Sequence, residues 1–487
     1  MLRPIVFIFK MCYNQSTTVQ KGIFMLKKLV GDRAFYKKVV GLMIPIMIQT
    51  GITNFVNMLD NVMVGRVGTN AMTGVAVANQ LIFVFNLCVF GAISGAGIFT
   101  AQFFGNGDIK GAMHTFRFKV IFCSLLTIVG ISVFAFKGEA LMRLYLSDEA
   151  NAVGAAETLA LAKRYMMIML IGLLPYAISQ CYGGTLREAG RPTIPMIAGI
   201  LAVIVNLTLN YVLIFGKLGA PRLGVAGAAI ATVISRFAEL LFLIIYTFIK
   251  SDKCRFILDG WKSPFVPWWL IKEIFKKGMP LMLNEALWSM GIALINQCYS
   301  VRGMDVVAAT NISQTFFNVF AVAFMSVGGA MGIILGHTLG SGKTEEAMST
   351  ATKLIAFSVF VSIIVGAVYI VAARYIPYMY NTSDDVRYIA MRLMQITALV
   401  MPIDAFAHAT YFTLRSGGKV FMTLLFDSCF IWIISVPVAL LLVHFTSMGI
   451  LGVYLCVQLV NLLKCVLGFI FVKRGGWVKN IVAEPNC

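Results

Sequence analysis

The chain contains a long internal repeat. Residues 45–107 align without a gap on residues 280–342, and a shorter match relates Leu186-Arg187 to Leu414-Arg415. The coinciding positions of the long match include Pro45/Pro280, Asn61/Asn296, Gly68/Gly303, Val84/Val319, Phe85/Phe320, Gly97/Gly332, Gly105/Gly340 and Gly107/Gly342. In an apolar chain, such a repeat indicates two homologous membrane bundles, and many transporters place paired bundles around a central site.

The composition places these bundles in a bilayer. Of the 487 residues, 59% are hydrophobic and only 13% are charged, whereas charged residues make up about a quarter of an ordinary globular domain. Twelve apolar stretches are long enough to span a membrane, since a spanning helix needs roughly 20 residues. We therefore expect an all-α polytopic membrane protein with twelve transmembrane helices in two pseudo-symmetric six-helix lobes. The expected parts are an N-terminal tail (1–38), an N-lobe (39–249), a linker (250–273), a C-lobe (274–472) and a C-terminal tail (473–487).

The net charge of +19 at first suggests a nucleic-acid partner. When both termini are placed in the cytoplasm, however, most Lys and Arg residues fall in cytoplasmic loops and tails, as the positive-inside rule requires. We expect a multi-pass protein of the cell membrane with both termini cytoplasmic, in contact with lipid and not with nucleic acid. Translation from Met25 instead of Met1 would give an ordinary short cytoplasmic tail.

The ten cysteines form no CxxC pair and have no metal-ligand spacing. Most lie in apolar stretches, where Cys behaves as a small apolar residue, so we interpret them as reduced and structural. The sequence therefore predicts no resident cofactor.

Acidic residues inside the apolar stretches are the strongest site signal, because a charge near the bilayer centre costs roughly 2.5 to 3.5 kcal/mol. Five residues belong to this group: Asp60, Glu239, Glu285, Asp404 and Asp427. Asp60 ends a polar stripe on one helical face that also contains Gln49, Thr53 and Asn57.

Later in the same half, Asn206 and Asn210 lie one helical turn apart, and the next stretch contains Thr232. Carboxylate, amide and hydroxyl oxygens together suit a hard monovalent cation, whereas a proton needs the carboxylate alone. We predict an N-lobe cation site at Asp60, Asn206, Asn210 and Thr232. The alternative is that these groups only hydrogen-bond helices to one another.

In the second half we expect Glu285 and Asp404 to form a lumen-facing acidic pair, because Pro402 frees backbone polar groups near Asp404. Their alternative role is a structural polar contact. We interpret Glu239 as the ion-pair partner of Arg236 and Asp427 as structural, near the cytoplasmic interface. Three residues are minor candidates for the site: Asn57, Gln314 and His408.

The two Leu-Arg turns lie on the cytoplasmic side in this scheme, where Arg187 and Arg415 can anchor at phosphate headgroups. By this division, only Arg236 and Lys464 are basic residues within the spans.

From about Lys37 to Lys473 the chain resembles the multidrug and toxic compound extrusion (MATE) family. The resemblance rests on the segment from Asn57 to Arg66, the turn Leu186 to Pro192 with the asparagines that follow it, and the segment Gly224 to Thr232. It implies export of amphiphilic or cationic drugs in exchange for inward Na+ or H+, by two lobes that alternate between outward-open and inward-open states.

The same resemblance assigns cation binding to Asp60, Asn206, Asn210 and Thr232, and cation or substrate binding to Glu285 and Asp404. The chain departs from the family pattern in two places. Some members have Asp where Asn210 stands, and a Tyr where Val400 stands. We expect a monomer and favour Na+, because neutral oxygen ligands accompany the carboxylates.

Three other classes of protein remain as alternatives. A flippase of the same superfamily for a lipid-linked saccharide would line its cavity with Arg and Lys. An intramembrane enzyme such as a prenyl transferase would need paired Asp-rich motifs, but Asp384-Asp385 stands alone. A channel would not need paired lobes. We therefore predict a transporter and not an enzyme.

Overall fold

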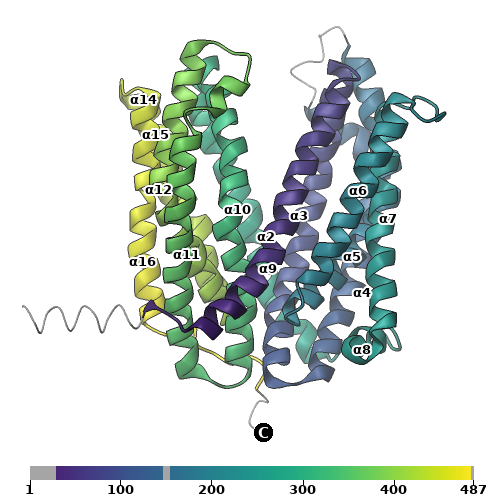
Figure 1. The fold of residues 1–487 in the computed structure, drawn as a ribbon, viewed down its shortest axis with the longest axis vertical. Helices are drawn as coiled ribbons and strands as arrows, with labels where there is room; N and C mark the ends of the chain where they lie inside the picture. The colour runs from purple at the N-terminus through teal and green to yellow at the C-terminus, as the bar shows by residue number, and fades with distance from the viewer. Residues whose placement is uncertain (1–28, 146–153, 484–487) are drawn as a thin grey trace, which may run out of the picture.

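The computed structural model describes residues 29–145 and 154–483 (Figure 1). Met1 and Met25 lie outside the described residues, and the first described long helix begins at Arg33, inside the predicted N-terminal tail. Within the described ranges the chain is nearly all helical and contains no strand. Twelve helical segments are long and apolar enough to cross a membrane, which confirms the predicted fold class. The first six are α2 (Arg33–Gly65), α3 (Thr69–Asn106), α4 (Ile109–Tyr145), α5 (Ala155–Glu188), α6 (Thr193–Phe215) and α7 (Val225–Ile249).

The second six follow the short helix α8 (Ser251–Gly260). They are α9 (Trp268–Ser300), α10 (Met304–Gly340), α11 (Thr344–Ala372), α12 (Asp384–Ser416), a segment formed by α13 (Val420–Leu424) and α14 (Val436–Phe445) with two π-helical turns between them, η3 (Leu425–Cys429) and η4 (Ile431–Ser435), and a last segment formed by α15 (Ile450–Leu459) and α16 (Asn461–Lys473). A 3-10 turn, η2 (Ile376–Met379), precedes α12.

The two sets of helices form two lobes with the same internal packing. We call α2–α7 the N-lobe and α9–α16 the C-lobe. In the N-lobe α3 packs against α4 and α5, and in the C-lobe α10 packs against α11 and α12. The repeat aligns α3 with α10, so equivalent helices make equivalent contacts. The lobes also meet crosswise, because α2 packs against α10, α9 packs against α3, and α3 packs against α10.

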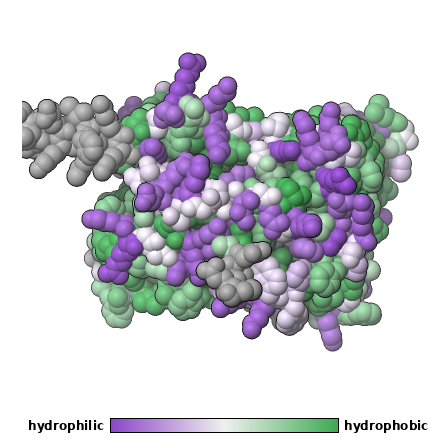
Figure 2. All heavy atoms as spheres, turned by 90° about the horizontal axis from the view of Figure 1, so that it is seen from below, coloured by the Kyte–Doolittle hydropathy of each residue, from purple (hydrophilic) through white to green (hydrophobic). Residues whose placement is uncertain are grey.

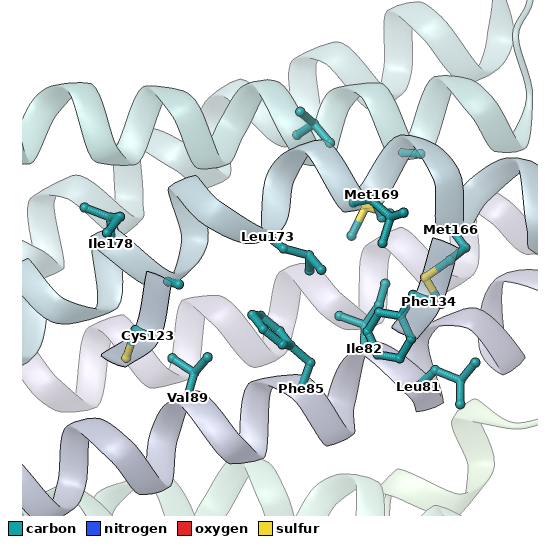
Figure 3. Packing of buried hydrophobic residues seen from close by; sticks show 14 of the residues in the cluster. Leu81, Ile82, Phe85, Val89, Cys123, Phe134, Met166, Met169, Leu173 and Ile178 are labelled. Carbon is teal, nitrogen blue, oxygen red and sulfur yellow. The ribbon is translucent and has the colours of Figure 1, made fainter. Parts of the chain in front are cut away.

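Apolar side chains from several helices build the core of the N-lobe, and α3, α4 and α5 supply most of them. Figure 3 shows Phe85 of α3 among residues of α4 and α5, including Phe134 and Leu173. Buried Ala and Gly residues let the helices approach closely. Such close packing matters in a membrane, because lipid tails are as apolar as the helices and the hydrophobic effect does little to hold helices together there. The core therefore holds α3, α4 and α5 together as one unit.

The helices extend beyond the apolar stretches. Helix α3 has 38 residues, which at 1.5 Å per residue is about 57 Å, longer than the roughly 30 Å hydrocarbon core. Hydropathy marks only the part of a helix inside the hydrocarbon. Polar residues placed in loops by hydropathy, such as Lys119 and Glu188, are therefore helical.

The predicted linker is partly helical and is held by a buried arginine. Arg117 of α4 donates to the backbone oxygens of Asp259 (2.8 Å), Gly260 (3.0 Å) and Phe265 (3.1 Å). A cation at the end of α8 satisfies carbonyls that the helix leaves unpaired. The contact fixes α8 against the end of α4.

We call residues 474–483 the C-terminal segment. This segment and α8 lie at the same end of the molecule, which we call the linker end (Figure 1). The two lobes meet near the linker end and diverge toward the other end. Figure 2, which views the linker end, shows hydrophilic residues over this face and hydrophobic ones around its edge. This distribution fits a protein whose sides face lipid and whose end faces water.

Candidate functional site

Four predicted site residues of the N-lobe lie in one chain of hydrogen bonds. Asn210 Nδ2 of α6 donates to Asp60 Oδ1 of α2 at 2.6 Å and to Asn206 Oδ1 at 3.0 Å. Asn206 Nδ2 donates to Thr232 Oγ1 of α7 at 3.3 Å. The structure therefore brings together all four residues that the sequence grouped, from three different helices.

Helix geometry explains why α6 joins the other two. Asn206 and Asn210 are one turn apart and 4% and 1% exposed, so both amides point into the lobe. The Asn210 Oδ1 atom is buried and has no hydrogen-bond partner among the described residues. A buried carbonyl oxygen without a partner is costly, and beside a carboxylate it is a suitable ligand for a cation.

Gln49 and Thr53 of the predicted α2 stripe have other partners. Gln49 Oε1 accepts from Arg187 Nη1 at 3.3 Å, and Thr53 donates to the backbone oxygen of Gln49 at 2.8 Å. The side chain of Asn57 lies outside the described part of the chain. Tyr165, which the sequence did not single out, donates to Asn79 at 3.2 Å nearby in the same lobe.

The two acids predicted as a C-lobe pair have separate partners. Glu285 Oε1 of α9 accepts from the hydroxyl of Tyr411 at 3.1 Å. Asp404 Oδ1 of α12 accepts from Asn461 Nδ2 of α16 at 3.2 Å. No hydrogen bond joins the two acids within residues 29–145 and 154–483. Val400, where some family members have Tyr, is a buried apolar residue. The phenol that contacts an acid of this lobe belongs to Tyr411 instead.

A third C-lobe acid forms an ion pair that the sequence did not predict. Lys464 Nζ of α16 lies 2.5 Å from Asp427 Oδ1, and Asn284 Nδ2 of α9 donates to Asp427 Oδ2 at 3.1 Å. We interpreted Asp427 as structural and reaching the interface, but its partner is a lysine from another span. The sequence showed both charged residues, but it did not show that they lie close together.

The minor candidates occupy different surroundings. His408 packs against the ring of Phe412 at a centroid distance of 4.9 Å, and its Nε2 atom has no partner in the described structure. No hydrogen bond links it to Asp404 there, so the structure shows no relay between them. Gln314 is exposed and donates to Asn318 at 3.1 Å along α10.

In the part of the chain that the structure describes, Arg236 and Glu239 do not form the predicted ion pair. Arg236 Nη1 donates instead to the backbone oxygen of Gly172 at 3.3 Å, and its guanidinium lies 4.9 Å from the centroid of the Tyr176 ring. Cation–π attraction and a buried carbonyl compete with the carboxylate for the same guanidinium. Spacing along one helix cannot reveal partners on another.

The arginines of the Leu-Arg turns line a cavity between the lobes. This cavity, of about 250 Å3, lies against Arg187 of the N-lobe and Arg415 of the C-lobe, with Phe90, Ile333 and Phe412 among its apolar walls. We expected both arginines in turns outside the spans, but they lie within helices, because α5 and α12 continue past the apolar stretches. Arg236 and Lys464 are therefore not the only basic residues within the membrane helices.

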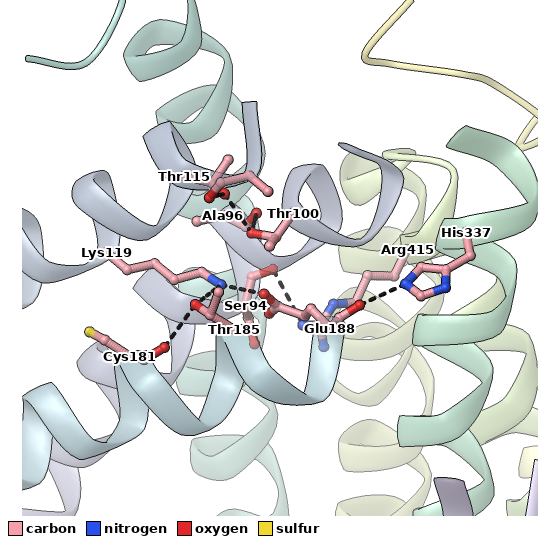
Figure 4. Close-up of polar contacts among 11 residues, drawn as sticks. Ser94, Ala96, Thr100, Thr115, Lys119, Cys181, Thr185, Glu188, His337 and Arg415 are labelled. Carbon is pink, nitrogen blue, oxygen red and sulfur yellow. Dashed lines mark hydrogen bonds and ion pairs between the residues drawn. The ribbon is translucent and has the colours of Figure 1, made fainter. Parts of the chain in front are cut away.

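Polar contacts across the lobes close the linker end of this cavity. His337 of α10 is 2.7 Å from the backbone oxygen of Glu188, and Arg415 Nη2 donates to that of Ser94 at 3.4 Å (Figure 4). The Glu188 carboxylate pairs with Lys119, which is fully buried. These contacts hold α5 and α3 of the N-lobe against α10 and α12 of the C-lobe.

The C-terminal segment also packs against the helices at the linker end. Trp477 is fully buried, and Asn480 Nδ2 donates to the backbone oxygen of Gly340 at 3.0 Å. Gln102 of α3 accepts from the Ile481 N–H at 2.8 Å and donates to the Lys479 oxygen at 3.2 Å. The segment thus contacts both the C-lobe, at Gly340, and the N-lobe, at Gln102.

Comparisons with known proteins agree with this architecture. The chain is 25% identical over 449 residues to the probable multidrug resistance protein NorM of Thermotoga maritima, covering 92% of this chain and 94% of that protein. It is 25% identical over 376 residues to the multidrug resistance protein MdtK of Yersinia enterocolitica, covering 76% and 79%.

Solved structures share the fold. A structure described as the outward-facing conformation of a multidrug resistance MATE family transporter of the MOP superfamily superposes with a TM-score of 0.81. The identity is 21%, covering 93% of this chain and 98% of that one. A MOP superfamily transporter from Pyrococcus furiosus, described as having a binding pocket of reverse polarity, gives a TM-score of 0.80 at 21% identity, covering 93% and 98%.

The family model named MatE matches residues 45–212 and 280–441, one stretch in each lobe and more than half of the chain. This match confirms the resemblance and the prediction of a transporter and not an enzyme. The chain belongs to the MatE family of multi-pass membrane transporters.

Proposed function

We propose that the protein is a secondary active multidrug efflux transporter that exports amphiphilic or cationic organic compounds in exchange for Na+ or H+. The observation that carries this proposal is the chain of hydrogen bonds through Asp60, Asn210, Asn206 and Thr232, whose buried Asn210 oxygen lacks a partner in the described structure. The names of the relatives as multidrug resistance proteins support the substrate class.

The N-lobe chain offers the ligands of a coupling ion. The Asp60 carboxylate provides one negative charge, and the amide and hydroxyl oxygens of Asn206, Asn210 and Thr232 provide neutral ligands. In the described structure Asp60 has no Lys or Arg within ion-pair distance, so its charge is available to an incoming cation. The neutral ligands favour Na+, whereas a proton needs Asp60 alone.

In the C-lobe, Glu285 and Asp404 are proposed to bind the positive charge of a substrate or a cation. Each accepts one neutral hydrogen bond, from Tyr411 and Asn461, and keeps its charge for a ligand. Cation binding and drug binding then compete, so that each promotes release of the other. Such coupling requires ligands that bind the two conformations with different affinities.

The proposed conformational cycle is alternating access of the two lobes, with both termini in the cytoplasm of the cell. The contacts at the linker end and the divergence of the lobes at the other end support assignment of this structure to the outward-open state. The hydrophilic linker end supports a cytoplasmic position for that end in the cell membrane. One chain contains both lobes and the cavity, so we propose a functional monomer.

A second candidate function is a flippase for a lipid-linked saccharide. The specific observation in its favour is that Arg187 and Arg415 line the cavity between the lobes, where guanidinium groups suit a phosphate. In a lipid-translocation assay with a fluorescent pyrophosphate-linked lipid, transfer that is lost in Arg187→Gln and Arg415→Gln favours the flippase.

Transport in reconstituted vesicles tests the main proposal. We expect ethidium efflux driven by an imposed inward Na+ or proton gradient, and loss of this response in Asp60→Asn. The matched control is Asp385→Asn, which removes an exposed carboxylate at the start of α12. Efflux that ignores both gradients, or that Asp60→Asn leaves unchanged, contradicts the proposal.

A further inference from the structure

Lys464 is a charged residue inside the C-lobe that the proposed transport cycle does not use. It lies on α16, within the last of the twelve spans, and its side chain is 11% exposed. Its partner Asp427 is 17% exposed. Two charges removed from water in this way are costly unless each has well-placed partners.

The carboxylate of Asp427 has partners on both oxygens. Lys464 Nζ lies 2.5 Å from Oδ1, and Asn284 Nδ2 donates to Oδ2 at 3.1 Å. Ser428 in turn donates to the Asn284 side-chain oxygen at 2.8 Å and so fixes the orientation of that amide. The Lys464 ammonium also lies 5.2 Å from the centroid of the Phe426 ring. The ion pair is therefore held from three helical segments.

The same face of α16 also contacts the neighbouring acid. Asn461, which donates to Asp404, is three residues before Lys464, so the two side chains lie one turn apart on one helical face. Cys465 donates to the backbone oxygen of Ile403, which keeps α16 close to this part of α12. Lys464 thus stands between Asp427, which it binds, and the surroundings of Asp404.

The two lobes differ in how their acids are neutralised. Among the described side chains of the N-lobe, Asp60 receives only an amide hydrogen bond, from Asn210, and an amide oxygen nearby has no partner. In the C-lobe, an ammonium group on the protein itself already occupies a position next to a carboxylate. The π-helical turn η3 carries Asp427, and wide turns of this kind are frequent at functional sites.

We propose that Lys464 is a tethered counter-cation, which takes the place of a coupling ion in the C-lobe and confines that ion to the N-lobe. The proposal deepens the proposed function and rests on it. The positive charge of Lys464 is part of the chain and does not enter or leave during the cycle. Only the N-lobe then exchanges an ion with the solution, and the remaining C-lobe acids, Glu285 and Asp404, are left for the substrate.

Na+-dependent thermal unfolding of the purified protein tests the inference without any transport measurement. The probe is NaCl, compared with N-methylglucamine chloride at the same ionic strength. In Asp60→Asn, with Lys464 intact, we expect no Na+-specific rise in Tm. In Asp60→Asn/Lys464→Met we expect a Na+-specific, saturable rise of several degrees, because Na+ then binds at the vacated carboxylate and a ligand of the folded state raises Tm.

A third variant and a second reading keep the test decisive. Adding Asp427→Asn to the double variant removes the carboxylate, and the Na+-specific rise is expected to disappear. A Na+-specific rise in Asp60→Asn alone overturns the inference even if the Lys464 variants do not fold. An absent rise in a folded Asp60→Asn/Lys464→Met protein overturns it as well. Failure of the proposed function appears separately, as efflux that ignores both ion gradients.

Discussion

Gln102 of the N-lobe and Ile481 of the C-terminal segment are joined by a hydrogen bond of 2.8 Å from the Ile481 N–H to the Gln102 side-chain oxygen. The amide nitrogen of the same side chain donates to the backbone oxygen of Ser416 in α12 at 3.0 Å. Gln102 is fully buried, so water does not compete for these bonds in the closed arrangement. One side chain thus holds the N-lobe, the C-lobe and the C-terminal segment together.

Gln102→Leu is expected to open the linker end. The leucine has a similar volume but cannot form these hydrogen bonds, each of which contributes about 1 kcal/mol. We expect the balance to shift toward the inward-open state by roughly tenfold or more, since 1.4 kcal/mol corresponds to a factor of ten. Spin labels placed at the exposed residues Lys110 and Lys343 report the change as a longer interlobe distance.

Lys479→Ala is the matched control, because this exposed residue contributes its backbone oxygen and not its side chain to the contact. It is expected to leave the distance distribution unchanged. If Gln102→Leu gives the distribution of the unmodified protein, the C-terminal segment does not hold the linker end closed.

Gly336→Ala is expected to separate the lobes by a different route. A Cβ atom at Gly336 would lie 2.6 Å from the Cβ of Ala101, so α10 and α3 cannot keep their present distance. Overpacking of this kind costs about 1 to 3 kcal/mol, and here the cost falls on the closed arrangement. The same spin-label pair should again show a longer distance. Gly41→Ala, at a position with open space around it, should not change that distance.

Lys119 and Glu188 form a buried ion pair whose loss is expected to destabilise the N-lobe. Lys119→Met leaves the Glu188 carboxylate without its cation, and breaking a buried pair in this way costs about 3 to 5 kcal/mol. Lys119→Met/Glu188→Gln removes both charges and should recover most of the loss. Thermal unfolding of the unmodified protein, the single variant and the double variant checks the expected order of stability. A double variant no more stable than Lys119→Met would contradict this account.

The pH dependence of α8 follows from Asp259, which lies outside the spans. A hydrogen bond from Lys262, at 2.6 Å, lowers the pKa of Asp259 below its usual value of 3.8. A lowered pKa in the folded state stabilises α8 above the unfolded pKa, and this contribution is lost as pH falls through the folded pKa. Hydrogen exchange of the α8 amides should therefore accelerate at acidic pH. Asp259→Asn should remove that part of the dependence.

The sequence predicted the fold because the fold depends on local signals. Apolar stretches mark membrane helices, and the match of Pro45 to Gly107 with Pro280 to Gly342 relates the two lobes. The N-lobe chain was also predictable. Asn206 and Asn210 have helical spacing, and a membrane-embedded Asp60 needs polar neighbours.

The remaining interactions depend on contacts between helices that no spacing reveals. Asp427 and Lys464 are 37 residues apart and lie on different spans, so only tertiary packing shows that they form a pair. Arg236 faces Tyr176 and Gly172 of another helix instead of Glu239 on its own. Spans predicted from hydropathy are also shorter than the helices, because polar residues near the end of a helix are still helical.

Asn210→Leu isolates the contribution of the amide to cation binding. The substitution removes the donor to Asp60 and the buried oxygen without a partner, while the charge of Asp60 remains. The lost oxygen is the proposed neutral ligand, so cation affinity should fall by roughly tenfold or more, which corresponds to about 1.4 kcal/mol. Titration of the purified protein with the coupling ion measures the change. Unaltered affinity would show that Asn210 is not a ligand.

The most direct test of the N-lobe as the coupling site is the release of a bound fluorescent cation from purified protein. Fluorescence anisotropy of bound ethidium is followed after addition of Na+ or after a pH jump, with the unmodified protein and with Asp60→Asn. We expect ion-induced release from the unmodified protein and none from Asp60→Asn. Equal ion-induced release from both proteins would contradict it.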